Sequence, residues 1–168
     1  TGKGDKIMEK KPFVTLAQAE EIAKTYPTPF YLYDEKGIRE NVKHLKQAFS
    51  WNKGYKEYFA VKATPNPFIL KILQEYGCGT DCSSLTELMM SKACGFSGSN
   101  VMFSSNDTPP EEFAYANEMG AIINLDDITH IQCLEDTLGF IPETISCRFN
   151  PGGVFKISND IMDNPGDA

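Results

Sequence analysis

Residues 58–94 read YFAVKATPNPFILKILQEYGCGTDCSSLTELMMSKAC, and this run contains two consecutive strand–helix units. Residues 58–61 are short, apolar and aromatic, as a buried strand should be. Residues 67–76 follow with apolar side chains at helical spacing, and Gly77 ends that helix. Residues 78–82 form a second strand candidate, and a second helix begins directly after them.

The same alternation of strand and helix continues toward the C-terminus. The further strands that we expect are residues 101–104, 121–125 and 144–149. The helices are opened or capped by Ser84, by Pro109 and Pro110, and by Asp126 or Asp127. Strand ends recur roughly every 20 residues, a period typical of parallel βα units. The fold class is therefore α/β.

Two parallel architectures remain open at this point, an open doubly wound sheet and the (β/α)₈ TIM barrel. Five units fill an open sheet, whereas a closed barrel needs eight. The sequence ends in the turn-like NPGDA, with no helix after the fifth strand. If the fold is a barrel, we expect this chain to hold only its first part.

The region before these units has a different character. Residues 28–34, TPFYLYD, are predicted to be extended and lead into a helix, and Thr15 caps a short helix before them. We therefore expect an N-terminal segment at 1–27, in which residues 1–7 are either a cloning remnant or an upstream extension. A barrel domain is expected at 28–168.

Composition excludes several classes of protein. Apolar residues make up 41% of the 168, and the formal net charge is −7, which argues against a surface for nucleic acid or an anionic membrane. No apolar run approaches the roughly 20 residues of a membrane span, and the N-terminus lacks a secretory signal. We therefore predict a cytoplasmic protein. Five cysteines without a CxxC pair fit neither a disulfide framework nor a common zinc site, and we predict no bound metal.

Lys62 is the candidate for chemistry, because ligands bind at the carboxyl ends of parallel strands. It follows four apolar or aromatic residues, so we expect its stem to lie in apolar surroundings. Burial favours the neutral amine, a nucleophile that can form a Schiff base with a carbonyl compound or with pyridoxal phosphate. The alternative is a lysine that extends from a strand end into solvent, which composition alone favours.

Other polar side chains at strand ends have two interpretations each. Asp81 is either a partner for a cationic lysine or a helix cap, and Glu87 completes a capping-box pattern with Ser84. Arg148 could face an anion, stack on a ring or pair with a surface carboxylate. The sequence contains no phosphate-binding loop, nucleophile elbow, hydrolase triad or metal cage.

Taken together, several motifs resemble the N-terminal part of the diaminopimelate decarboxylases, members of the fold-type III, alanine-racemase-like pyridoxal-phosphate enzymes. These motifs are TPFYLYDEKGIREN, EYFAVKATPNPFILKILQEYGCGTDCSSLTEL, VMFSSNDT, INLDD and CRFNPGG. The resemblance runs from about Thr28 to the end of the chain. Its most specific element is FAVKA, which contains Lys62, followed by Asp81.

The resemblance implies that pyridoxal phosphate is the cofactor and that Lys62 holds it as a Schiff base on the first barrel strand. Ala60 would lie beside the cofactor, Asp81 near Lys62, Glu87 in the same shell, and Arg148 would reach the site from the fifth strand. The substrate would be a small amino acid, meso-diaminopimelate, which loses carbon dioxide to give L-lysine. The resemblance also implies a homodimer.

The resemblance also places parts of the site beyond Ala168: a stacking histidine, a Gly-rich phosphate loop, the acid that pairs with the pyridine nitrogen, and a C-terminal β-domain. Neither His44 nor His130 lies where the stacking histidine should. We therefore expect the 168-residue chain to be inactive alone. Three alternatives stay open: a related ornithine, arginine or carboxynorspermidine decarboxylase, a non-catalytic pyridoxal-phosphate-binding protein, and an α/β interaction module.

Overall fold

The computed structural model describes residues 11–149 of the chain. The expectations for residues 1–7 and for the turn-like end at 164–168 lie outside these residues. The chain divides into two compact units between Leu45 and Lys46.

In the described part of the first unit, from residue 11 onward, the chain forms one helix and most of a second. In α1 (Leu16–Thr25), Thr15 and Gln18 form a reciprocal capping box, which confirms the predicted cap. Residues 28–34 belong to neither helix nor strand, and α2 (Glu35–Ala48) begins directly after them and continues across the boundary. The placement of the domain boundary at residue 28 stays a prediction.

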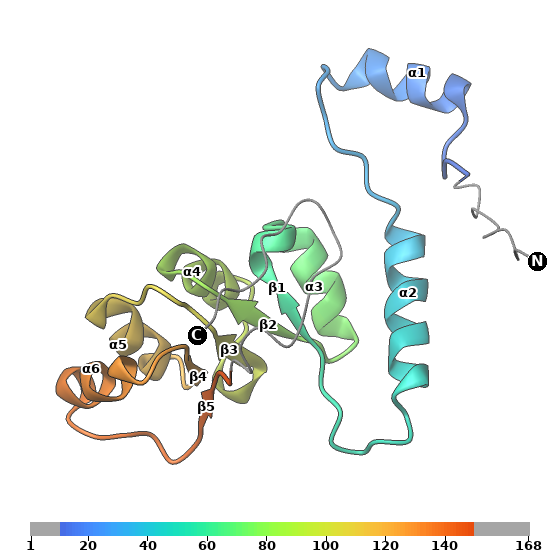
Figure 1. The fold of residues 1–168 in the computed structure, drawn as a ribbon. Helices are drawn as coiled ribbons and strands as arrows, with labels where there is room; N and C mark the ends of the chain where they lie inside the picture. Colours follow the sequence, from blue (N-terminus) through green and yellow to red (C-terminus); the bar gives the residue numbers. More distant parts are fainter. Residues whose placement is uncertain (1–10, 150–168) are drawn as a thin grey trace, which may run out of the picture. The chain divides into compact units, whose positions relative to one another are not determined.

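The second unit is a parallel sheet with a helix after each of its first four strands (Figure 1). The strands are β1 (Tyr58–Ala60), β2 (Gly79–Cys82), β3 (Val101–Phe103), β4 (Ile122–Leu125) and β5 (Ile145–Cys147). The helices are α3 (Pro67–Glu75), α4 (Leu85–Ala93), α5 (Pro110–Glu118) and α6 (Thr129–Leu138), with 3₁₀ turns at Val61–Ala63 and Gly98–Asn100. All four strand pairings are parallel. The predicted parallel βα units are thereby confirmed.

The strand order decides between the two architectures. It runs β1-β2-β3-β4-β5 without reversal, whereas a doubly wound sheet reverses its order and carries helices on both faces. Right-handed crossovers in one direction place every helix on the same face. Five units of this kind belong to a (β/α)₈ barrel, and the interpretation as the first part of such a barrel is confirmed.

Burial alternates along the strands as a barrel wall requires. The positions that face the helices are buried: Thr80, Cys82, Val101, Phe103, Ile123 and Leu125. The other face, called the inner face below, carries half-buried residues: Ala60, Asp81, Met102, Asn124 and Ser146. Polar side chains that could meet a ligand therefore lie on the face opposite the helices.

The core lies between the sheet and α3 to α6. Phe103 of β3 and Phe113 of α5 are both fully buried and meet edge to face, with ring centroids 6.3 Å apart. Leu70, Leu88 and Leu134 bring one buried side chain each from α3, α4 and α6. This layer holds the strands in place. Within residues 11–149, no helix has the length and apolar character needed to cross a membrane.

We expect the 168-residue chain to self-associate when it is produced alone. Within residues 11–149, β1 and β5 each pair with one strand only, so each offers an unpaired edge, and the inner face is uncovered. Sedimentation velocity over a range of concentrations should show species larger than one chain. A monodisperse monomer that unfolds cooperatively would contradict this expectation and favour the α/β interaction module.

Candidate functional site

Lys62 lies just past the carboxyl end of β1, in the 3₁₀ turn Val61–Ala63. Val61 is fully buried, whereas Lys62 is exposed. The expectation of apolar surroundings for Lys62 is wrong for this structure. The reason is local: the turn directs consecutive residues to different sides, so that Val61 enters the core and Lys62 does not.

Asp81 is the carboxylate that the resemblance places near Lys62, and that placement stays a prediction. It lies on the inner face of β2, in register with Ala60 on β1. Burial raises the pKa of the Asp81 carboxyl, while a hydrogen bond from Ser104 and the positive charge of Lys62 lower it. The Ser104 Oγ donates to Asp81 Oδ1 across 2.5 Å. Asp81 and Lys62 therefore interact electrostatically at the carboxyl edge of β1 and β2.

Glu87 is fixed in the first turn of α4, directly after β2. Its carboxylate accepts hydrogen bonds from the Ser83 N–H at 3.0 Å, the Ser83 Oγ at 3.1 Å and the Ser84 Oγ at 3.3 Å. Ser84 caps the helix by accepting the N–H of Glu87 at 3.4 Å. The predicted cap by Ser84 is confirmed. In a full capping box the Glu87 carboxylate would accept the backbone N–H of Ser84, whereas here it accepts the backbone N–H of Ser83. Glu87 also raises the pKa of Asp81, which shows that its charge acts on the same site.

Arg148 belongs to a different group of side chains, at the far edge of the sheet. Its backbone N–H donates to Leu125 O at 2.9 Å, and its Nη1 donates to Asp126 Oδ1 at 2.8 Å. Asp126 raises the pKa of the Arg148 guanidinium. Of the interpretations left open by the sequence, the structure shows the pairing with a carboxylate.

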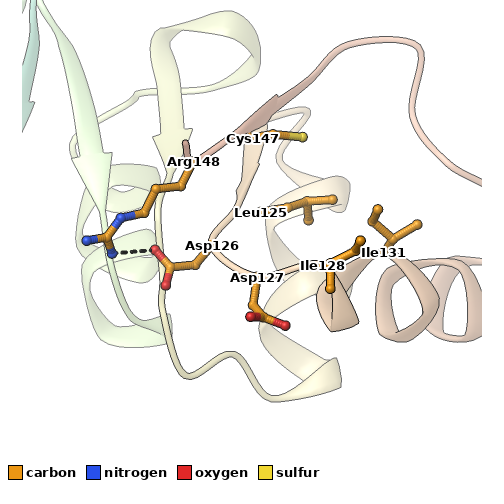
Figure 2. A pocket seen from close by; sticks show the side chains of 7 residues that line it. All are labelled: Leu125, Asp126, Asp127, Ile128, Ile131, Cys147 and Arg148. Carbon is orange, nitrogen blue, oxygen red and sulfur yellow. Dashed lines mark hydrogen bonds and ion pairs between the residues drawn. The ribbon is translucent and has the colours of Figure 1, made fainter. Parts of the chain in front are cut away.

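Arg148 and Asp126 are turned toward each other, while Leu125, Ile131 and Cys147 are turned to the other side (Figure 2). These residues border a cavity of about 190 Å³, and its lining is Leu125, Asp126, Asp127, Ile128, Ile131, Cys147 and Arg148. Asp127 accepts hydrogen bonds from the N–H and Oγ1 of Thr129 at 2.8 and 2.7 Å, and these bonds lower its pKa. Asp127 therefore binds the first residue of α6, but the N-cap position is occupied by Ile128, so the expected cap at Asp126 or Asp127 is displaced by one residue.

The structure thus brings Lys62, Asp81 and Glu87 into one group, with Ala60 beside Asp81 in the sheet. It does not bring Arg148 to them, since β1 and β5 are the two edges of the sheet that residues 11–149 form. The sequence did not predict the contact of Ser104 with Asp81. The signal was its position two residues after Met102, on the same face of the sheet and at the strand end.

The chemistry of these residues fits pyridoxal phosphate. An exposed primary amine can reach an aldehyde, and a carboxylate beside it stabilises positive charge on the nitrogen. Lys62 and Asp81 supply these two groups on a face that the helices leave uncovered.

Residues 35–156 match the family described as pyridoxal-dependent decarboxylase, pyridoxal binding domain. Protein TabA of Pseudomonas amygdali pv. tabaci is 38% identical over 84% of this chain and 33% of its own length. The diaminopimelate decarboxylase of Methanothermobacter thermautotrophicus is 34% identical over 80% of this chain and 32% of its own length. The chain therefore spans about a third of the length of the curated relatives that it matches.

Solved structures show the same fold. Diaminopimelate decarboxylase from Helicobacter pylori, complexed with L-lysine, has a TM-score of 0.69 and 30% identity over 80% of this chain and 34% of its own. Lysine decarboxylase from Selenomonas ruminantium has a TM-score of 0.73 over 84% of this chain and 37% of its own, and at 21% identity it supports the fold alone. Pyridoxal phosphate, the cofactor that the resemblance implied, is confirmed for this family by its pyridoxal-binding domain. The chain belongs to the pyridoxal-dependent decarboxylases, whose pyridoxal-binding domain it matches over residues 35–156.

Proposed function

We propose that the complete protein is a pyridoxal-phosphate-dependent decarboxylase that converts meso-diaminopimelate to L-lysine and carbon dioxide, in lysine biosynthesis. The observation that carries the proposal is the electrostatic interaction of Lys62 with Asp81, whose strand position is in register with Ala60. Relatives named diaminopimelate decarboxylase at 34% and 30% identity support this substrate class. We further propose that the complete protein is a homodimer in the cytoplasm. The family resemblance supports the dimer, and a one-subunit mass in sedimentation of the complete protein would contradict it.

In this proposal Lys62 holds the cofactor covalently through Nζ. When bound, pyridoxal phosphate accepts the electron pair that the departing carboxylate leaves behind. Ala60, next to Asp81 in the sheet, leaves space on the inner face because its side chain is a single methyl group. Asp81 stabilises positive charge beside Lys62, and Glu87 adds negative charge while its hydrogen bonds to Ser83 fix its position.

Arg148 can take part in cofactor binding only if it leaves its present partner, Asp126. It would bind the cofactor side of the site from β5, as the resemblance implies, but here its guanidinium pairs with Asp126. The side chains of both residues are partly exposed, at 53% and 23%, so this ion pair contributes little to stability. Arg148 can therefore exchange Asp126 for another anion at small cost.

Borohydride reduction followed by peptide mapping tests the proposal directly. We expect the complete protein, loaded with pyridoxal phosphate, to carry the reduced adduct on Lys62. Lys56 offers a matched control because its Nζ is held by Ser99 O and Asn100 Oδ1 at 2.9 and 2.6 Å, so Lys56→Ala should leave the adduct unchanged. The same treatment of the 168-residue chain shows how much the remaining parts of the site contribute. If the complete protein carries no adduct on Lys62, the proposed function is wrong.

A panel of amino acids tests the substrate. The proposal requires kcat/KM for meso-diaminopimelate to exceed the values for ornithine, arginine, lysine and carboxynorspermidine by at least roughly 10²-fold, because sites built for polar groups reject analogues that lack them. Protein TabA, at 38% identity, shows that the chain's similarity extends beyond proteins named diaminopimelate decarboxylase. A higher kcat/KM for another amino acid of the panel would contradict meso-diaminopimelate as the substrate but would still support decarboxylation as the reaction.

A further inference from the structure

Ser104 lies at the end of β3 in a position that the sheet fixes closely. Its backbone N–H donates to Cys82 O at 2.8 Å, which continues the β2–β3 ladder past Phe103. Met102 pairs with Asp81, and Ser104 is two residues further along the same face. The sheet itself therefore brings the Ser104 hydroxyl to the Asp81 carboxylate.

Ser104 and Asp81 are joined by a short hydrogen bond, and Asp81 has charges of both signs near it. Ser104 Oγ donates to Asp81 Oδ1 at 2.5 Å, and Asp81 is half-buried. The charged groups that act on Asp81 come from two elements: Lys62 from the 3₁₀ turn after β1, and Glu87 from α4. Burial and Glu87 favour the neutral acid, whereas Ser104 and Lys62 favour the carboxylate. Ser104 is thus the uncharged side chain whose hydrogen bond opposes the effect of burial on the pKa of Asp81.

We propose that Ser104 is a positioning residue for the Lys62 site: its hydroxyl keeps Asp81 ionised and holds one carboxylate oxygen in a fixed direction beside Lys62. The inference rests on the proposed function for its catalytic meaning, because only a lysine that carries the cofactor needs a fixed anion beside it. The hydrogen bond also restricts the rotation of the Asp81 side chain, which otherwise turns freely about its terminal torsion.

Ser104→Ala removes the donor with little change in volume. Burial and Glu87 then act against Lys62 alone, so the pKa of Asp81 should rise by roughly one pH unit, the effect of one hydrogen bond to a charged group. Its protonation can be followed in the complete protein by the carboxyl stretch in pH-difference infrared spectra. Asp81→Asn identifies the band. In Ser104→Ala the acid limb of kcat/KM should move to higher pH by the same amount.

Two variants separate this role from packing. Ser104→Thr keeps a hydroxyl and should restore the wild-type midpoint, and Ser104→Cys, a weaker donor, should give an intermediate one. Ser146→Ala is a matched control, because the Ser146 hydroxyl also bonds across the inner face, at 2.8 Å, but to the uncharged amide oxygen Oδ1 of Asn124. It should leave the Asp81 midpoint unchanged.

An unchanged midpoint in Ser104→Ala and Ser104→Cys, or a shift equal to that of Ser146→Ala, would overturn the inference. The proposed function is judged separately, by the borohydride adduct on Lys62 of the wild-type protein. If that adduct is absent while the infrared midpoint still moves, Ser104 controls the charge of Asp81 and the decarboxylase proposal fails. If the adduct is present and the midpoint does not move, the positioning role fails alone.

Discussion

Replacing Lys62 with alanine is expected to abolish covalent capture of pyridoxal phosphate by the complete protein and to lower kcat/KM for decarboxylation by roughly 10³-fold or more. The alanine methyl group cannot act as a nucleophile toward an aldehyde. The Lys62 side chain is exposed, so the free energy of unfolding should change by no more than about 0.5 kcal/mol. Absorbance of the bound cofactor, steady-state rates and urea denaturation measure the three quantities.

Lys62→Arg is the matched variant for this prediction. A guanidinium keeps the positive charge beside Asp81 but remains protonated at any pH that the protein tolerates, so it is no nucleophile. We expect Lys62→Arg to fail in covalent capture as Lys62→Ala does, while the electrostatic support of Asp81 is retained. Capture or turnover within tenfold of wild type in either variant would show that another residue binds the cofactor.

Phe103→Ala is expected to lower the free energy of unfolding by about 3–5 kcal/mol. The side chain is fully buried, at the centre of the layer between sheet and helices, and its ring meets Phe113 edge to face. Truncation therefore leaves a cavity and also removes an aromatic pair worth about 0.5–1.5 kcal/mol. Urea denaturation followed by circular dichroism gives the difference.

Phe68→Ala is the control for this second prediction. Phe68 lies in α3 with 80% of its surface exposed, so the same change of side chain should alter stability by no more than about 0.5 kcal/mol. Equal losses for Phe68→Ala and Phe103→Ala would mean that Phe103 does not occupy the centre of the core.

Much of the fold followed from local pattern. Apolar runs of strand length predicted all five strands, and a predicted helix follows each of the first four, because these signals depend on residues close together in the chain. The first strand ends one residue earlier than expected, since Val61 already belongs to the 3₁₀ turn. The fifth was expected to reach Phe149 and ends at Cys147. The choice between open sheet and barrel could not be made this way, because periodicity does not say which strands pair.

The candidate site was predictable in part for the same reason. Parallel strands end at one edge, so Lys62 and Asp81 could be expected to meet, and their electrostatic interaction agrees with this. The exposure of Lys62 was missed because its apolar neighbours suggested burial, whereas the turn separates it from Val61. Ser104 was missed because serine is common at strand ends, and only the register of β2 against β3 gives it a partner.

Every pairing in the sheet joins strands that are consecutive in the chain. Contacts between segments that lie near one another in the chain cost less loop-closure entropy than distant ones, and N-terminal segments leave the ribosome first. Strands β1, β2 and β3 can therefore associate on the ribosome as soon as they have emerged, without waiting for distant partners. Since Lys62, Asp81 and Ser104 all come from these three units, the proposed cofactor-binding corner would be assembled early in translation, before β4 and β5 add to the wall.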